Sequence, residues 1–127
     1  MFDKIGAITL FVGDVDRAKA FYASVFDAAV VFEDDVSAVF GFGPTVVNLL
    51  ARGEAPELVT PAPVAAPGAG AAALLTIWVE DCDAACARLA EVGVALLNGP
   101  VDRPWGQRTA AFSDPDGHVW EFAQHLQ

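Results

Sequence analysis

Hydrophobic and polar positions alternate along the opening segment of the chain and then change period. Residues 5–12 predict a strand that is apolar on both faces. Asp14 follows as a helix N-cap, and apolar side chains then recur at helical spacing from Val15 to about Asp27. Turn residues at Asp34-Asp35 and Gly43-Pro44 separate up to three further predicted strands: Ala29–Glu33, Ser37–Phe42 and Thr45–Arg52. The first half of the chain therefore predicts the order β-α-β-β-β.

The same pattern occurs a second time. The segment Thr9–Asp16 returns as Thr76–Asp83, with a strand predicted at Ala73–Glu80 and a helix that is capped near Asp81 and ends before Gly93. Three more strands are predicted at Val94–Leu97, Gln107–Ser113 and Val119–Gln124. Such a repeat indicates one supersecondary unit built twice. We expect a ligand to lie at the seam between the two copies.

Segments rich in Pro and Gly connect these elements. Pro, Ala and Gly dominate from Gly53 to about Gly70 without periodicity, which predicts a linker. Asn98–Gly106 predicts a loop, and Asp114–Gly117 predicts a type I hairpin turn. The predicted fold class is α+β, a single domain over 1–127 with a first module at 1–53, a linker at 54–71 and a second module at 72–127.

Composition places the chain among globular proteins. Of its 127 residues, 54% are hydrophobic and 19% are charged. Asp3 and Lys4 interrupt the start of the chain before any apolar run, so no signal peptide is expected there. The most apolar stretch, Ala62–Leu75, contains two prolines and two glycines and cannot form a membrane-spanning helix. We expect a cytoplasmic protein that does not bind a membrane.

The net charge of −10 argues against nucleic acid as a partner, because binding to phosphates requires Lys and Arg. Acidity at a binding site would concentrate cationic small molecules. Alternatively, the acidic surface serves only to keep the protein soluble.

Cys82 and Cys86 lie four residues apart at the start of the second predicted helix. They could form a redox pair, although a cytoplasmic chain offers no oxidising environment. Small apolar core residues are the simpler interpretation.

Three motifs carry a resemblance to a known family. Asp16-Arg17-Ala18 and Phe21-Tyr22 in the first helix, together with FSDPDGHVWEF at 112–122, resemble the vicinal oxygen chelate superfamily. That superfamily includes glyoxalase I, extradiol dioxygenases, fosfomycin-inactivating enzymes and bleomycin-binding resistance proteins. The resemblance implies that each module curls its strands and that two modules, from one chain or from two chains of a dimer, close a cup.

The resemblance also locates the positions at which metal enzymes of this superfamily hold a divalent ion. These positions fall on Ala7, Leu74, about Asn48, and Glu121. Only Glu121 is a good ligand, because Ala and Leu offer no lone pair and Asn is a weak donor. We therefore expect no metal and no cofactor. His118 and His125 are interpreted as polar surface residues and not as replacement ligands.

Strand alternation predicts which side chains share the cup face with these positions. An apolar and aromatic lining with sparse polar points is typical of a small-molecule site. Trp105, in a loop, could stack on a ligand, plug the barrel end or pack at a dimer interface, whereas Trp120 is expected in the core. The predicted ligand-binding residues are Thr9, Phe11, Asn48, Arg52, Thr76, Trp78, Trp105, Thr109 and Glu121.

Glu121 has three possible roles: a general base, a partner for a cationic ligand, or an ion pair with Arg52 or Arg108. The leading hypothesis is a metal-free protein resembling the bleomycin-resistance branch that sequesters a hydrophobic or aromatic, including cationic, drug or metabolite. The alternative is a lyase or dioxygenase-like enzyme that uses Glu121 with an unconventional metal site or as an acid or base. A third is an interaction module with a filled cup. Open strand edges also predict a homodimer.

Overall fold

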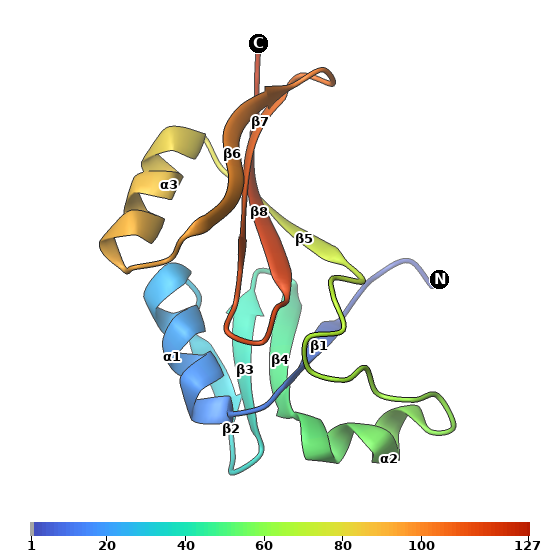
Figure 1. Cartoon of the computed structure of the whole chain (residues 1–127). Helices are drawn as coiled ribbons and strands as arrows, with labels where there is room; N and C mark the ends of the chain where they lie inside the picture. Colours follow the sequence, from blue (N-terminus) through green and yellow to red (C-terminus); the bar gives the residue numbers. More distant parts are fainter. Residues whose placement is uncertain (1) are drawn as a thin grey trace. The chain divides into compact units, whose positions relative to one another are not determined.

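The structure is a computed structural model that describes residues 2–127. The chain divides into two compact units: the first ends at Ala69 and the second is Gly70–Gln127. The elements of the first unit are coloured blue to green in Figure 1. They are β1 (Ala7–Val12), α1 (Val15–Val25), β2 (Val30–Glu33), β3 (Ser37–Phe42), β4 (Thr45–Ala51), the 3₁₀ helix η1 (Arg52–Glu54) and α2 (Ala55–Val59).

The second unit repeats the order of the first without its two short C-terminal helices. Within residues 70–127 the elements are β5 (Leu74–Trp78), α3 (Cys82–Glu91), β6 (Leu96–Arg103), β7 (Gln107–Ser113) and β8 (Val119–His125). In the described residues each unit holds one four-stranded mixed sheet, with strand orders β1-β4-β3-β2 and β5-β8-β7-β6. The β1–β4 and β5–β8 pairs are parallel and the others are antiparallel. The repeated β-α-β-β-β order and the α+β class are thereby confirmed.

Aspartates begin both long helices, as the sequence predicts. The carboxylate of Asp14 accepts a hydrogen bond from the backbone N–H of Arg17 at 3.0 Å, and that of Asp81 accepts one from Ala84 at 3.0 Å. Each carboxylate satisfies a first-turn N–H that has no partner within the helix. The equivalent caps give the chain the same strand-to-helix turn in both units.

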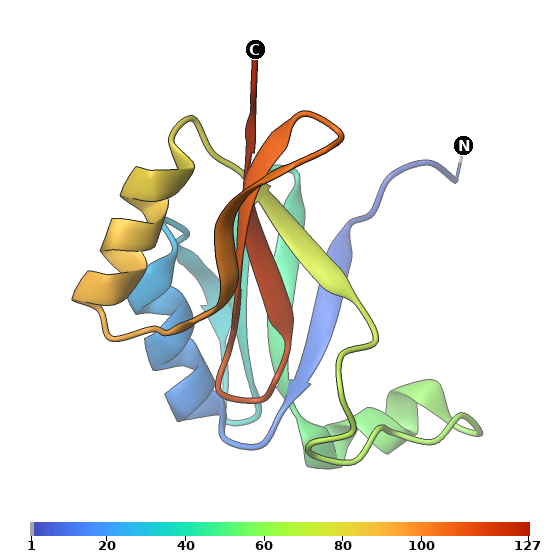
Figure 2. The same cartoon turned by 45° about the horizontal axis from the view of Figure 1, so that its top comes forward.

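The two long helices, α1 and α3, each pack on one face of their own sheet, as Figures 1 and 2 show. In the first unit Tyr22 of α1 is fully buried and its ring centroid lies 6.0 Å from that of Phe40 in β3. In the second unit Leu89 of α3 is 1% exposed, and Phe112 and Trp120 of the sheet are also buried. The prediction that Trp120 belongs to the core is confirmed.

Two segments differ from the predicted loops. The predicted linker at 54–71 contains α2, because Pro56 occupies the first helical turn, where its missing N–H costs nothing, and Glu57 and Leu58 favour helix. The predicted loop at Asn98–Gly106 is largely strand, since β6 extends to Arg103. Pro100 is tolerated there because β6 is an edge strand and carries irregular register on both sides of Asn98. In the described residues, no helix is long and apolar enough to cross a membrane.

Candidate functional site

In the second unit α3 covers one face of the sheet, and the opposite face is called here the α3-distal face. Strand pairing sets Thr76 of β5 beside Glu121 of β8, Glu121 beside Ala111 of β7, and Ala111 beside Asn98 of β6. Because directly paired residues point to the same side of a sheet, these four side chains form one row across the α3-distal face. The next row contains Trp78 and Thr109.

Glu121 is the acidic group of this face. The Thr76 hydroxyl donates a hydrogen bond to its Oε1 at 3.1 Å, and the side chain is half-buried. The hypothesis that Glu121 pairs with Arg108 is wrong, because Arg108 lies on the α3 side of the sheet. There its guanidinium binds Asp83 at 3.1 Å and Asp102 at 2.6 Å, and these carboxylates raise the pKa of Arg108 above its ordinary value.

Trp78 lies on the α3-distal face with 59% of its surface exposed. Its ring stacks on the imidazole of His125, with centroids 4.6 Å apart and planes inclined by 24°. His125 shares this face because β8 extends one residue beyond the predicted end at Gln124 and the alternation continues. Exposed aromatic surface held in a fixed orientation is the feature that stacking ligands require.

Trp105 occupies the turn between β6 and β7 and is 66% exposed. Its indole Nε1 donates to Oε1 of Gln107 at 3.3 Å, which ties the ring to the start of β7. Gln107 pairs directly with His125 on β8, so it belongs to the α3-distal face.

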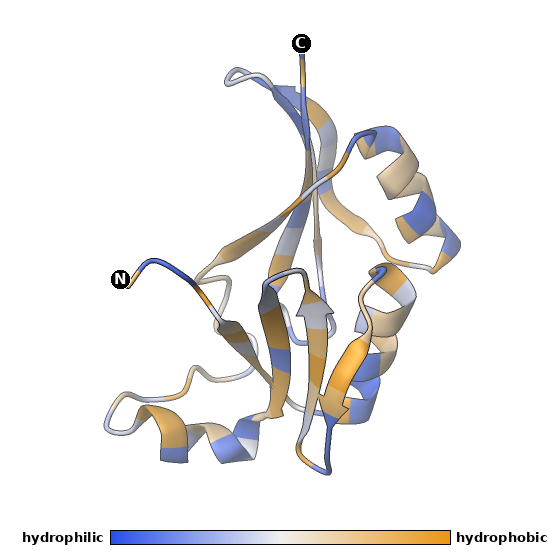
Figure 3. Ribbon diagram, turned by 180° about the vertical axis from the view of Figure 1, so that it is seen from behind, coloured by the Kyte–Doolittle hydropathy of each residue, from blue (hydrophilic) through white to orange (hydrophobic). Residues whose placement is uncertain are grey.

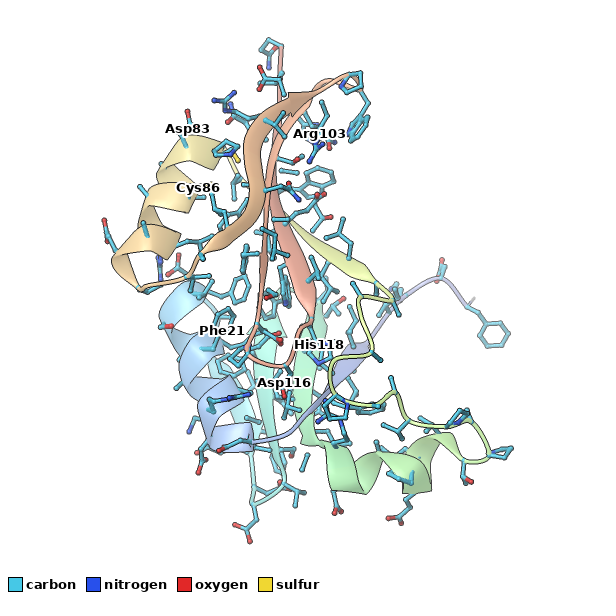
Figure 4. The ribbon with its side chains drawn as sticks, viewed as in Figure 1. Phe21, Asp83, Cys86, Arg103, Asp116 and His118 are labelled. Atoms are coloured by element: carbon cyan, nitrogen blue, oxygen red, sulfur yellow. The ribbon has the colours of Figure 1, made fainter. Side chains whose placement is uncertain are left out.

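Arg103 also belongs to this face, for a reason that lies in the backbone of β6. Between the pairs Asn98–Ala111 and Val101–Thr109, β6 has two intervening residues and β7 has one. Because β6 has one extra residue in this interval, Val101 and Arg103 point to the same face of the sheet as Asn98. The Arg103 Nε donates to Thr109 Oγ1 at 2.9 Å and its Nη2 donates to Asn98 Oδ1 at 3.1 Å. Figure 4 labels Arg103 in the orange hairpin of β6 and β7.

The first unit carries the other four predicted site residues. Thr9 of β1 pairs with Asn48 of β4, and Phe11 pairs with Leu50 two residues further on, all on the face opposite α1. Arg52 follows β4 at the start of η1. Asn48 Oδ1 and Arg52 Nε are both buried, and neither has a hydrogen-bond partner among residues 2–127. Such atoms are costly to leave unpaired and are therefore candidates for contact with a ligand.

A metal does not fit the positions that the family resemblance assigns to it. Ala7 and Leu74 carry hydrocarbon side chains, while Asn48 and Glu121 contribute one amide and one carboxylate. Across residues 2–127 no three His, Cys, Asp or Glu side chains gather closely enough to hold an ion. Two oxygen donors fall short of the three or four protein ligands of a transition-metal site.

The two cysteines do not supply a reactive group. Cys82 is buried, Cys86 is half-buried, and both thiols are free. Burial is the main cause that raises the pKa of Cys82 to about 11, with the neighbouring Cys86 adding to it. Burial also raises the pKa of Cys86. Both thiols are therefore protonated near neutral pH, which opposes nucleophilic and redox chemistry.

Sequence reasoning missed four residues of the α3-distal face: Asn98, Arg103, Gln107 and His125. Alternation continued by one residue from Ala123 identifies His125, and backwards from Thr109 it identifies Gln107. Asn98 and Arg103 are five residues apart, and regular alternation would put them on opposite faces. The Gly99-Pro100 pair between them was the available sign of a bulge.

Comparison with known proteins places the chain among relatives of the same fold. A structure titled as a glyoxalase/bleomycin resistance protein/dioxygenase from Nocardioides matches with a TM-score of 0.87 at 22% identity, over 100% of this chain and 86% of that one. Lactoylglutathione lyase from Agrobacterium tumefaciens matches with a TM-score of 0.77 at 22% identity, over 95% and 92%. At these identities the likeness shows the fold alone.

TnmS3, an antibiotic binding protein from Streptomyces sp. CB03234, matches with a TM-score of 0.74 at 30% identity, over 98% of this chain and 97% of that one. The model of the Glyoxalase/Bleomycin resistance protein/Dioxygenase superfamily matches residues 4–122. The repeated β-α-β-β-β units, the paired aspartate caps and this match over nearly the whole chain lead to one conclusion: the protein belongs to the glyoxalase/bleomycin resistance protein/dioxygenase superfamily.

Proposed function

We propose that this protein binds a flat, hydrophobic or aromatic small molecule, including cationic drugs or metabolites, and sequesters it without chemical turnover. The observation that carries the proposal is the α3-distal face of the second sheet. There the exposed Trp78 ring, oriented by His125, lies one row from the Glu121 carboxylate. Stacking on an indole contributes about 0.5–1.5 kcal/mol beyond the burial of apolar area.

Three further observations support the binding of a ligand. The metal positions of the superfamily hold Ala7 and Leu74, so this chain lacks the donors that Lewis-acid chemistry would use. TnmS3, an antibiotic binding protein, is 30% identical over nearly the full length of both chains. The buried, unpaired Asn48 Oδ1 and Arg52 Nε add polar atoms that a ligand could satisfy in the first unit.

The second candidate is an enzyme of the same superfamily in which Glu121 acts as a general acid or base. It is favoured by the position of this carboxylate, half-buried and hydrogen-bonded to Thr76. No step through a metal is proposed, because the donor set does not fit one.

A combined screen separates the two candidates. Thermal shift and tryptophan fluorescence are measured against a natural-product panel and against divalent metals, and every compound that binds is recovered and analysed by mass spectrometry. Binding with recovery of unchanged compound supports sequestration. Conversion of the compound by the native protein, abolished in Glu121→Gln, supports the enzyme. Stoichiometric stabilisation by a transition metal would overturn the metal-free proposal.

We also propose that the protein is a homodimer. In the described residues, β2 is an edge strand of the first sheet, and Figure 3 colours it as strongly hydrophobic. Its apolar side chains are exposed: Val30 at 37%, Val31 at 60% and Phe32 at 56%. An exposed apolar edge normally pairs with another chain or is protected by charge or proline.

A further inference from the structure

Among the residues that the structure describes, Arg103 is a cation without an anionic partner, in a chain that is rich in acids. The sequence has 17 Asp and Glu against 7 Lys and Arg. Arg108, on the other face of the same hairpin, binds two carboxylates. Within residues 2–127 the hydrogen bonds of the Arg103 guanidinium go to two neutral oxygens, those of Thr109 and Asn98. The charge of Arg103 is thus left uncompensated.

The two neutral bonds also orient the guanidinium. Nε and Nη2 lie on the same edge of the planar group, and this edge is occupied by Thr109 Oγ1 and Asn98 Oδ1 at 2.9 and 3.1 Å. Thr109 is only 2% exposed, so its hydroxyl is a fixed anchor. The edge formed by Nη1 and Nη2 keeps two parallel N–H donors, which is the geometry that binds a carboxylate through both oxygens.

Among residues 2–127, the acidic and basic groups of the α3-distal face, Glu121 and Arg103, form no ion pair with each other. Asn98, which holds the guanidinium, lies in the same row as Glu121 but two strands away. With neighbouring strands 4.7–4.9 Å apart, the backbone positions of Asn98 and Glu121 are separated by about 10 Å. Between them in this row lies Ala111, which carries no charge of its own.

We propose that the Nη1–Nη2 edge of Arg103 binds an anionic group of the ligand, so that this face selects aromatic compounds bearing a carboxylate or a similar planar anion. The inference rests on the proposed function and names its ligand class. The aromatic ring stacks towards Trp78, the anion lies over β6, and any cationic substituent points to Glu121 on β8.

Three probes of one shape test the charge preference: 2-naphthoate, 2-naphthamide and 2-naphthylmethylammonium. Their affinities are measured by isothermal titration calorimetry on the full chain. The variants are Arg103→Gln, Trp78→Ala and Arg108→Gln, the last removing the same charge from the opposite face. We expect 2-naphthoate to bind about tenfold more tightly than 2-naphthamide. This preference is lost in Arg103→Gln and kept in Arg108→Gln.

Two supporting variants address folding and geometry. Arg103→Lys keeps the charge but not the planar pair of donors, and it should retain only part of the preference. If Arg103→Gln does not fold, as judged by its thermal melt, Asn98→Ala takes its place, since it leaves the charge and removes one anchor. In that case a reduced preference for 2-naphthoate supports the proposal, and an unchanged one contradicts it.

The remaining outcomes distinguish failure of the Arg103 inference from failure of the proposed function. Equal affinity for 2-naphthoate and 2-naphthamide, both dependent on Trp78, would overturn the role of Arg103 and leave the proposed function standing. An equal loss in Arg103→Gln and Arg108→Gln would do the same, because it shows only the effect of net charge. Failure of all three probes to bind in a Trp78-dependent way at millimolar concentration would overturn both.

Discussion

Trp78 is the side chain whose loss should matter most for binding. More than half of its surface is exposed, so its removal leaves few packing contacts broken, while a stacked ligand loses the indole. We expect Trp78→Ala to weaken the binding of a ligand found in the screen at least about tenfold, about 1.4 kcal/mol. The melting temperature should change little. Calorimetry and a thermal melt measure the two effects.

Trp105→Ala is the comparison variant, since that ring is similarly exposed but is tied to Gln107 at the hairpin turn. If Trp105→Ala weakens binding and Trp78→Ala does not, the assignment of the face is wrong, and the rim at the β6–β7 turn becomes the better candidate.

The buried thiol of Cys82 gives a prediction about pH. Its pKa is raised to about 11 in the folded chain, so the protonated thiol contributes stability that is complete below the ordinary cysteine pKa. That contribution is lost as the pH rises from about 9 to about 11, because the unfolded chain ionises first. The melting temperature of the native protein should fall over this range more steeply than that of Cys82→Ala. Parallel curves for the two proteins would contradict the burial of this group.

Single residues of the site were predictable from sequence only where the alternation of the strand is regular. Thr76, Trp78 and Glu121 lie on the predicted face because β5 and β8 are regularly paired. Arg103 could not be assigned to this face from sequence, because the bulge in β6 interrupts the regular alternation of side chains. The sequence did not reveal the partner of Glu121 either. Arg108 was one candidate, but its side chain lies on the opposite face of the sheet.

At the scale of elements, the irregularity of β6 depends on Gly99. A Cβ at this position would lie 2.3 Å from the carbonyl oxygen of Thr109 and 2.8 Å from Cα of Ala110, and its φ is +86°. We expect Gly99→Ala to destabilise the protein by about 3 kcal/mol or more, because the backbone of β7 must move. Chemical denaturation gives the free energy of unfolding.

Gly106 provides the control for backbone conformation alone. It lies at the turn of the same hairpin with a φ of +87°, and a Cβ there would meet nothing within 4 Å. Gly106→Ala should therefore cost about 1–2 kcal/mol, the strain of a left-handed residue. Equal losses in the two variants would mean that the close approach of β6 to β7 is unimportant.

Helices and strands with a regular apolar period were predicted with nearly their observed bounds, whereas α2 and the proline-containing part of β6 were not predicted. Asp caps and apolar spacing identified α1 and α3, and alternation identified β3 and β7 with their observed bounds. In both of these segments a proline led to the prediction of a loop. Pro56 begins α2 and Pro100 lies within an edge strand, and each position tolerates the missing N–H for a reason that depends on its neighbours.

For the whole molecule, the internal repeat was the decisive signal. It predicted two units with one strand order, and both sheets follow it. The two copies nevertheless differ in chemistry along equivalent rows. The row of Thr9 continues through Asn48 and Val39, whereas the row of Thr76 continues through Glu121 and Ala111. Ligand choice depends on these few substitutions, which a shared backbone pattern does not reveal.

The proposed dimer is tested at this scale. Light scattering at micromolar concentration should give about twice the 13.3 kDa chain mass. Val31→Lys places a charge on the exposed apolar edge of β2 and should shift the protein towards the monomer. Lys4→Glu, a charge change outside the strands, should not. A monomeric native protein would refute the dimer, and a dimer that survives Val31→Lys would move the contact to another edge.

The contact between Trp78 and His125 has an optical consequence. An imidazole whose centroid lies 4.6 Å from that of an indole is close enough to quench the fluorescence of the excited ring. A compound that slides between the two rings, or replaces the imidazole, changes the brightness of this one chromophore. The fluorescence of Trp78 should therefore report whether the site is occupied. In His125→Ala the imidazole is absent, so the fluorescence of this variant provides the unquenched reference.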